Sequence, residues 1–133
     1  MIRVVPFHRD HRDGMVRLCR AEGWSSYADD PALAERVWTA PGVTTVVAVD
    51  DALPIGMVTG FAQFQGDGAI QAHLSTVLVD ESSRGQGIGR ALVIEGFWMT
   101  GCQRVDLVSL AGADRFYESF EHQRHHGYRI YPS

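Results

Sequence analysis

The sequence has no long apolar run and few cysteines. No stretch approaches the roughly 18 apolar residues that a transmembrane helix needs, and no apolar leader segment follows Met1. We therefore expect no membrane partner and a cytoplasmic location. There are only two cysteines, and neither belongs to a Cys-x-x-Cys pair. This pattern argues against a disulfide scaffold, a structural zinc site and thioredoxin-like chemistry.

An excess of positive charge is also missing. The chain has 12 basic and 16 acidic residues, with a formal net charge of −4. Nucleic acids are bound mainly through Lys and Arg contacts with phosphates, so we expect no nucleic-acid partner. His122, His125 and His126 have no nearby cysteine or suitably placed carboxylate, and we predict no metal site. The length of 133 residues and the 45% hydrophobic content fit one globular domain over residues 1–133.

Apolar segments that alternate with turn residues predict an α+β fold in the order β-α-α-β-β-β-α-β-α-β. The three middle strands are joined by short turns, which predicts an antiparallel meander. Strands are expected at residues 2–5, 43–49, 54–64, 69–79, 104–110 and 127–131. Helices are expected at 10–22, 31–38, 88–100 and 113–121, and in the third of these we expect Ile88, Ala91, Leu92, Trp98 and Met99 to point mostly inward.

The most informative segment is a glycine-rich loop between the strand at 69–79 and the helix at 88–100. It reads Arg84-Gly85-Gln86-Gly87-Ile88-Gly89-Arg90. Glycines let the backbone approach a ligand, and the free N–H groups at a helix N-terminus favour an anion such as a diphosphate. Arg84 and Arg90 can add charge-assisted hydrogen bonds. The loop is therefore a candidate phosphate-binding site.

Other interpretations of this loop differ in how well they fit. A P-loop is excluded because no Gly-Lys-Ser/Thr follows. The dinucleotide-binding pattern G-x-G-x-x-G finds Asp106 at a suitable distance, but the third glycine comes one residue early. Too little chain also remains for a six-stranded doubly wound sheet. A strand-to-helix turn with no ligand stays open on the residues alone.

The segment Arg84–Gly89 resembles motif A of the GNAT superfamily of N-acetyltransferases, whose pattern is Arg/Gln-x-x-Gly-x-Gly/Ala. Val77-Leu78-Val79 is similar to the strand that leads into this motif, and Phe116-Tyr117-Glu118 is similar to the Phe-Tyr-Glu of the family's penultimate helix. The resemblance implies a GNAT-like, mostly antiparallel mixed sheet flanked by helices. It also implies transfer of an acetyl group from acetyl-CoA to a primary amine by direct attack in a ternary complex.

The resemblance assigns roles to individual residues. Tyr117 matches the acid that protonates the CoA thiolate, with a core aromatic as the alternative. His73 stands where some members carry a glutamate base, and it would face the cleft if Ala72 and Leu74 face the core. A histidine on a polar sheet surface is the alternative for this position. The residues implied in binding pantetheine and pyrophosphate are Val77, Leu78, Val79, Arg84, Gly85, Gln86, Gly87, Ile88, Gly89 and Arg90.

The acceptor wall of this superfamily usually comes from the first two helices and their loop. Here that stretch carries Trp24 and Tyr27 beside acidic residues, which suits a cationic amine with an apolar body. A solvated acidic turn with one packed tryptophan is the alternative. The expected acceptor is an amine of a small molecule or peptide, and a homodimer is compatible with the pattern. Leu110 replaces an asparagine that the family often shows, which leaves a non-catalytic acyl-CoA sensor as a second function.

Overall fold

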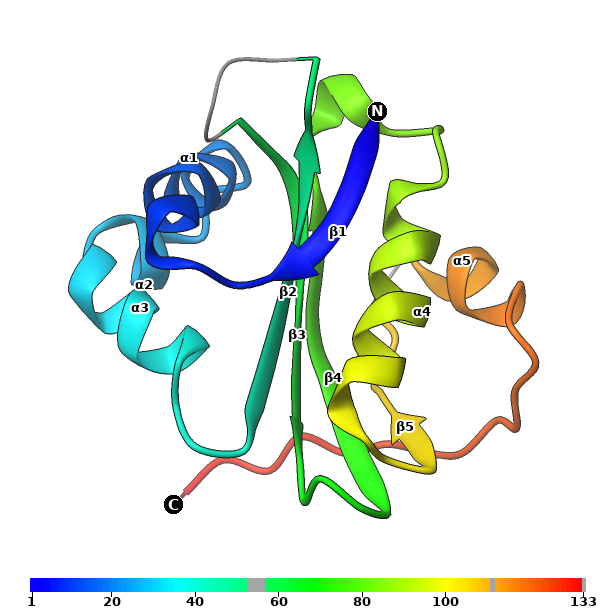
Figure 1. The fold of residues 1–133 in the computed structure, drawn as a ribbon. Helices are drawn as coiled ribbons and strands as arrows, with labels where there is room; N and C mark the ends of the chain where they lie inside the picture. The colour runs from blue at the N-terminus through cyan, green and yellow to red at the C-terminus, as the bar shows by residue number, and fades with distance from the viewer. Residues whose placement is uncertain (53–56, 111, 133) are drawn as a thin grey trace.

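The structure is a computed structural model that describes residues 1–52, 57–110 and 112–132. Five strands form one sheet in the order β1-β2-β3-β4-β5 (Figure 1). Antiparallel pairing joins β1 (Ile2–Pro6), β2 (Val43–Asp50), β3 (Val58–Gly66) and β4 (Gln71–Val79). The short strand β5 (Arg104–Asp106) runs parallel to β4. The predicted α+β class and the antiparallel meander are confirmed.

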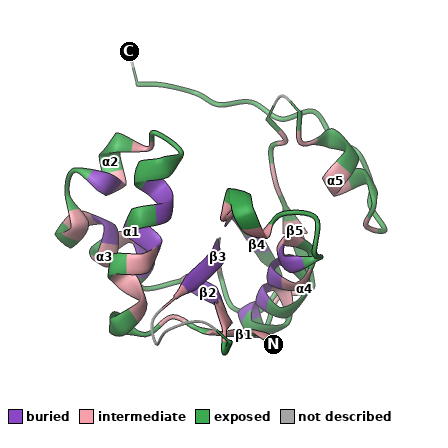
Figure 2. Cartoon of the chain, turned by 90° about the horizontal axis from the view of Figure 1, so that it is seen from above, coloured by how far each residue is buried: buried purple, intermediate pink, exposed green. Residues whose placement is uncertain are grey.

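Helices cover both faces of the sheet (Figures 1 and 2). One face carries α1 (Arg12–Ala21), α2 (Ser25–Ala28) and α3 (Pro31–Trp38), and the other carries α4 (Ile88–Thr100). α3 and α4 have the predicted bounds. The remaining helical elements are the 3-10 turns η1 (Arg9–His11) and η2 (Glu81–Ser83) and the short helix α5 (Asp114–Glu118), which lies beyond the β5 edge.

The α4 face of the sheet is packed around a glycine. Leu92 is fully buried and Ile88 is almost so, and both contact the same cluster as Phe64 and Leu74. A Cβ atom at Gly96 would lie only 2.2 Å from Cε1 of Phe64, so the helix approaches β3 more closely than any other residue would permit. This contact holds α4 against the sheet and thereby positions the loop that precedes the helix.

The opposite face is built around aromatic rings. Trp38 of α3 is 5.4 Å from the ring of Phe61 in β3, and Tyr27 stacks on Trp38 at 5.8 Å with an interplanar angle of 8°. Met15 and Leu18 of α1 complete this cluster. Burial of these apolar residues joins the three short helices to the sheet.

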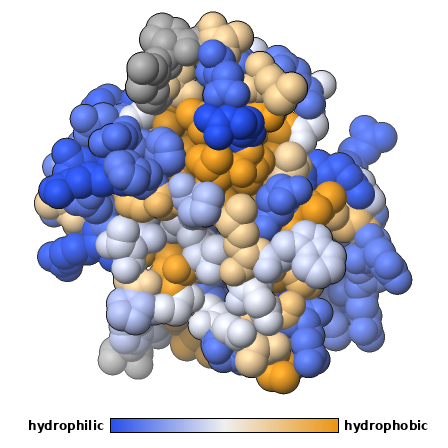
Figure 3. Space-filling model, in the orientation of Figure 1, coloured by the Kyte–Doolittle hydropathy of each residue, from blue (hydrophilic) through white to orange (hydrophobic). Residues whose placement is uncertain are grey.

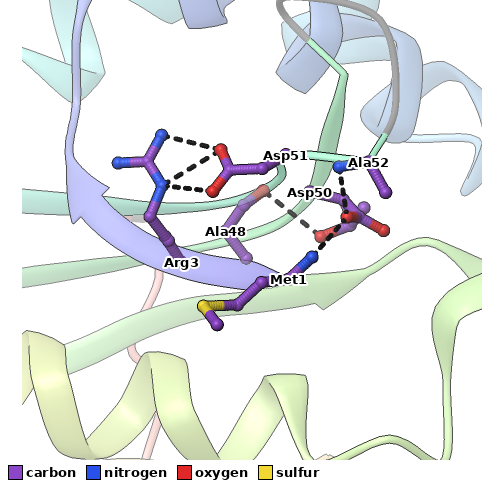
Figure 4. Close-up of polar contacts among 7 residues, drawn as sticks. Met1, Arg3, Ala48, Asp50, Asp51 and Ala52 are labelled. Atoms are coloured by element: carbon purple, nitrogen blue, oxygen red, sulfur yellow. Dashed lines mark hydrogen bonds and ion pairs between the residues drawn. The ribbon is translucent and has the colours of Figure 1, made fainter.

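Polar contacts hold the edge strand β1 in place (Figure 4). The Arg3 guanidinium donates to both carboxylate oxygens of Asp51 at 2.8–3.0 Å, and the Met1 ammonium lies 3.3 Å from Oδ1 of Asp50. The hydrogen bonds from Arg3 hold the pKa of the Asp51 carboxyl below its usual value. Figure 3 shows a hydrophobic patch over β1 and hydrophilic side chains over α1–α3.

The strand predicted at 127–131 does not form. Residues 121–132 are all exposed and make no strand pairing (Figure 2 shows an extended tail that runs from the α5 side toward the side of α1–α3). β5 ends at Asp106 instead of at residue 110, so it is too short to serve as a pairing partner for residues 127–131. Without a partner strand or a buried face, a strand with Tyr128 and Ile130 on one side is not stable.

Two predicted core positions of α4 are also wrong. Trp98 is 78% exposed and Met99 is 39% exposed. The buried stripe of the helix follows Ile88, Leu92, Gly96 and Thr100 at four-residue steps. At about 100° per residue, Trp98 lies on the opposite side from Gly96.

The predicted strand at 54–64 is shifted in the structure. β3 is described from Val58 and continues to Gly66, while residues 53–56 lie outside the described part of the chain. The turn after it forms around Asp67, whose Oδ1 accepts from the backbone N–H of Ala69 and Ile70 at 2.8 and 2.7 Å. These hydrogen bonds lower the pKa of the Asp67 carboxyl. They also place the turn of the chain after Gly66, so β3 continues beyond the predicted end at residue 64.

Candidate active site

β4 and β5 pair over only three residues and then separate. The paired positions are Gln71 with Arg104, Ala72 with Val105 and His73 with Asp106. In the part of the chain that the structure describes, β4 has no pairing with β5 beyond His73. Backbone groups on this edge of β4 between His73 and Val79 are therefore open to a ligand that adds hydrogen bonds to the strand, apart from the Val79 carbonyl, which accepts from Arg84.

A bulge in β4 reverses the direction of its side chains. Gln63 pairs with Thr76 and Phe64 pairs with Leu74, so Ser75 is the extra residue. Before the bulge, Ala72 and Leu74 are buried, and Leu74 packs with the α4 cluster. After it, Val77 and Val79 pack on that cluster and Leu78 packs on the α1–α3 cluster.

The two neighbours of His73 on β4 determine which face of the sheet it occupies. Ala72 and Leu74 are only 1% and 4% exposed, so both face the core as the prediction for His73 required. By alternation His73 lies on the opposite face, exposed and on the side of α1–α3. Thr76 lies on the same face beyond the bulge. His73 therefore stands on the open side of the strand, near the point where β4 and β5 separate.

The glycine loop has the backbone geometry of an anion site. Gly85 and Gly87 have φ values of +80° and +81°, a region that favours glycine, and no atom lies within 4 Å of a Cβ built at either position. Gly87 is the N-cap of α4 and has no side-chain cap, so the first N–H groups of the helix are left for another acceptor. The loop and the helix N-terminus fit a pyrophosphate group.

Gly89 differs from these two glycines. A Cβ at this position would lie 3.3 Å from the ring of Phe116 and 3.7 Å from Val79. It is therefore a packing glycine that lets α5 approach the start of α4. Since Tyr117 follows Phe116, this contact also positions the candidate acid.

The two arginines of the motif point to different parts of the molecule. Nε of Arg84 donates to the Val79 carbonyl at 3.1 Å, and its Nη2 donates to Oε1 of Glu22 at 2.5 Å. Arg90 instead lies over the Phe120 ring at 4.5 Å and donates to Ser119 Oγ at 3.3 Å. Arg84 is thus beside the loop, whereas Arg90 is held against the segment after α5.

Sequence reasoning missed the contacts between α1 and this loop. Arg17 donates to the Val58 carbonyl at 3.0 Å and lies 3.6 Å from Oδ2 of Asp80. Glu22, one of the acidic residues near Trp24, is paired with Arg84. The positions of Arg17 and Glu22 gave no sequence signal for partners so far along the chain. Together they join the acceptor side of the molecule to the loop.

Tyr117 lies in the α5 helix, half-buried in the same cluster as Val77 and Val79. Its ring packs edge-on to Phe116 with 5.0 Å between centroids. Burial raises the pKa of the Tyr117 hydroxyl, so the group keeps its proton at neutral and mildly alkaline pH. A protonated hydroxyl beside the separated strands is suited to donate a hydrogen bond or a proton.

The two expected acceptor residues pack into the wall between α1 and α3. Trp24 and Tyr27 are both half-buried, and their ring centroids are 6.4 Å apart. Burial raises the pKa of the Tyr27 hydroxyl. Of the nearby acids, Asp30 caps α3 by accepting from the Leu33 N–H at 3.1 Å. The aromatic pair is thus part of the core, with a partly exposed edge.

The described residues contain neither a cluster of metal ligands nor a membrane-spanning helix. Across residues 1–52, 57–110 and 112–132, no three His, Cys, Asp or Glu side chains come together as metal ligands. No described helix has the length and apolar character to cross a bilayer.

The chain resembles known proteins both in sequence and in fold. A family model described as an acetyltransferase (GNAT) domain matches residues 41–123. An acetyltransferase from Trypanosoma brucei is 22% identical, with 100% of both chains covered and a TM-score of 0.78. The aminoglycoside N-acetyltransferase AAC(6')-Iy, solved in complex with CoA, is 19% identical, with 100% of this chain and 95% of that chain covered and a TM-score of 0.78.

A third structure extends the range of acceptors among the structural neighbours. The ribosomal-protein-alanine N-acetyltransferase from Brucella melitensis is 15% identical, with 100% of this chain and 99% of that chain covered and a TM-score of 0.75. No curated protein matches the chain. At these identities the structural similarities establish the fold, while the family model spans more than half of the sequence. The chain therefore belongs to the GNAT acetyltransferase family.

Proposed function

We propose that this protein is an N-acetyltransferase that moves the acetyl group of acetyl-CoA to a primary amine of a small molecule or peptide. Residues 1–133 act as one domain in this proposal. GNAT enzymes use acetyl-CoA as co-substrate. The observation that carries the proposal is the uncapped start of α4, with its two open positive-φ glycines, next to the unpaired edge of β4.

Each part of acetyl-CoA has matching residues on this surface. The amides from Arg84 to Gly89 bind the pyrophosphate, and the Arg84 guanidinium adds a charge-assisted contact. Backbone groups of Val77 and Val79 pair with the pantetheine as an added strand would. The same edge then directs the thioester toward Thr76, where the acceptor side of the sheet begins.

The reaction is a direct transfer between the two substrates. The amine nitrogen attacks the thioester carbonyl carbon, forming the C–N bond, and the C–S bond then breaks to release the CoA thiolate. His73 removes a proton from the amine, directly or through a water, and Tyr117 gives a proton to the sulfur. The remaining contribution of the protein is to hold the two reactants in an attacking geometry. Trp24 and Tyr27 contact the apolar body of the amine.

The test combines a binding and a turnover measurement. Acetyl-CoA at about 100 times its Kd should stabilise the fold by about 2.7 kcal/mol, whereas NAD should not shift Tm. Acetylation is then measured by mass spectrometry over a panel of primary amines. Because all 12 basic residues are arginine, the chain has no lysine side chain that could be acetylated in place of the acceptor.

The same measurements distinguish a second function. Leu110 stands where the family often shows an asparagine, which favours an acyl-CoA sensor without turnover. A Tm shift with acetyl-CoA but no acetylated product from any amine supports the sensor and contradicts the enzyme. No Tm shift with millimolar acetyl-CoA contradicts both.

A further inference from the structure

The face of the sheet that carries His73 contains one buried polar group without a partner. The side chain of Gln63 in β3 is 1% exposed, and within the described part of the chain its Nε2 has no hydrogen-bond partner. Buried side-chain amides are normally paired, since an unpaired one loses its bonds to water without replacement. The Gln63 amide is therefore a candidate group for binding a polar ligand.

Neighbouring residues do not use the amide. Thr45 lies opposite Gln63 on β2, and its hydroxyl donates to the Trp38 carbonyl at 2.8 Å. On the other side Gln63 pairs with Thr76 of β4 through the strand backbone. Among the described residues, no atom of the cluster on this face, which includes Phe61 two residues earlier on β3, accepts a hydrogen bond from Nε2.

Gln63 lines a cavity of about 410 Å³. The cavity lies between the end of α3 and the ends of β2 and β3, a region that Figure 1 shows on the α3 side of the sheet. None of the side chains around it is charged. Its walls are Val37, Ala40, Pro41, Gly42, Val43, Gln63, Gln65 and Gly66.

The cavity is adjacent to the point of acetyl transfer in the proposed function. Gln63 and Thr76 are directly opposite in neighbouring strands, which lie about 4.8 Å apart. Gln65 is likewise opposite His73, the proposed base. A polar strip of Gln63, Gln65, His73 and Thr76 thus leads from the cavity to the edge of β4 where the thioester would lie.

We propose that this cavity, with Gln63 in its wall, binds the end of the acyl acceptor remote from the attacking amine and selects amines that carry an uncharged carboxamide or peptide group. The proposal rests on the proposed function. A side-chain amide has a donor and an acceptor, and a carboxamide offers both in return. The match holds whichever way the Gln63 amide is turned.

The uncharged lining excludes other acceptor classes. A second ammonium group, as in a polyamine, would lose its hydration with no carboxylate in the wall to replace it. A carboxylate would likewise meet no cation. The apolar walls instead suit the methylene groups that separate the amine from the carboxamide.

The experiment compares acceptors of similar length that differ at one end. The probes are 4-aminobutanamide, 4-aminobutanoate, 1,4-diaminobutane and pentylamine, each tested with saturating acetyl-CoA. We expect kcat/KM to be at least tenfold higher for 4-aminobutanamide than for the other three. A tripeptide amide with a free N-terminus separates a peptide acceptor from a small-molecule one. Equal rates for all four small amines would overturn the proposal.

Two variants test Gln63 itself. Gln63→Met keeps the length and removes the polar group, so the tenfold preference for 4-aminobutanamide should vanish while the Kd of acetyl-CoA stays within twofold. The same variant should raise Tm, because an unpaired buried amide is lost. Gln103→Met, the same change at an exposed position, should alter neither the acceptor preference nor Tm. Gln63→Glu should shift the preference toward 1,4-diaminobutane.

The results separate this proposal from the proposed function. An unchanged preference in Gln63→Met, or a lower Tm, shows that Gln63 is a structural residue and overturns the proposal even if amines are acetylated. If no amine is acetylated, calorimetry with the CoA-saturated protein still measures 4-aminobutanamide binding. Binding that Gln63→Met weakens at least tenfold supports the site without turnover, and no binding overturns it.

Discussion

The two faces of the sheet are packed in different ways. On one face a single helix, α4, lies so close to β3 that only a glycine fits at Gly96, and the buried cluster there is wholly apolar. On the other face three short helices pack on an aromatic stack and leave a cavity lined by Gln63, whose amide nitrogen has no partner among the described residues. The close packing at Gly96 fixes the position of the α4 backbone. The aromatic face instead leaves a cavity and the polar side chain of Gln63.

This difference matches the two substrates of the proposed reaction. Binding of a pyrophosphate requires backbone N–H groups at fixed positions, and close packing of α4 supplies them. Recognition of an acceptor requires space and selective polar contacts, which the α1–α3 face offers. The ion pair between Arg84 and Glu22 and the contacts of Arg17 are where the two regions meet.

The largest effect is expected at Tyr117, beside the separated strands. Tyr117→Phe keeps the ring packing and removes the hydroxyl, so kcat should fall by about 10²–10⁴-fold with little change in acetyl-CoA affinity. Burial raises the Tyr117 pKa, so the wild type should lose activity only at alkaline pH, when the hydroxyl is deprotonated, and the variant should lack that limb. A kcat unchanged in the variant, with chemistry rate-limiting, would reduce Tyr117 to a packing residue.

A smaller effect is expected at His73, on the acceptor face. His73→Ala should lower kcat/KM for the amine by about 10²-fold, the low end for loss of a general base. His125→Ala, in the exposed tail, is the control and should leave kcat/KM unchanged. An unchanged kcat/KM in His73→Ala, with chemistry rate-limiting, would place the base elsewhere.

The close packing of α4 is tested by enlarging its central glycine. A side chain at Gly96 meets Phe64 and also Val46, whose Cγ2 lies 3.1 Å from the added Cβ. Gly96→Val should therefore reduce the free energy of unfolding by about 1–3 kcal/mol in urea denaturation. Glu95→Ala, on the exposed side of the same helix, should change it by no more than about 0.5 kcal/mol. Full stability in Gly96→Val would mean that α4 can move away from the sheet without cost.

The loop itself is tested by a matched pair of glycines. Gly87 and Gly68 have φ values of +81° and +77°, and neither has an atom within 4 Å of an added Cβ. Gly87→Val and Gly68→Val should therefore cost similar backbone strain, about 1–2 kcal/mol. Only Gly87→Val should weaken acetyl-CoA binding, by about tenfold or more, as measured by calorimetry. Equal acetyl-CoA affinity in the two variants would remove the loop from the pyrophosphate site.

These regions also differ in how far the sequence predicts them. The bounds of α3 and α4 follow from local signals, Asp30-Pro31 before α3 and a glycine on each side of α4. The strand at 127–131 fails because its pattern says nothing about whether β5 is long enough to pair with it. Trp98 fails because a nearly all-apolar helix does not identify its inner face until Gly96 is seen against Phe64.

The candidate site shows the same limit. Motif A could be assigned because all of its residues lie in one short stretch of the chain, and the exposure of His73 followed from simple alternation with Ala72 and Leu74. The bulge at Ser75 and the pairing of Gln63 with Thr76 depend on strand register, which no local pattern specifies. The partnership of Arg84 with Glu22 spans 62 residues and is likewise invisible without the fold.

The smallest effect is expected where the two regions meet. Glu22 holds Arg84 in the free protein, so acetyl-CoA must compete with its carboxylate for the guanidinium. Both side chains are partly exposed, and such pairs contribute about 0–1 kcal/mol. Glu22→Gln should therefore tighten acetyl-CoA binding by no more than about fivefold, since about 1.4 kcal/mol corresponds to tenfold. The gain should shrink at high salt, which screens exposed charges.

A double-mutant cycle shows whether Glu22 acts through Arg84. In an Arg84→Met background, Glu22→Gln should leave the Kd of acetyl-CoA unchanged, because no guanidinium is left to be released. Glu81→Gln, an exposed acid in the same loop, controls for the general loss of negative charge near the phosphates. If Glu22→Gln still tightens binding without Arg84, its carboxylate acts by repelling the phosphates.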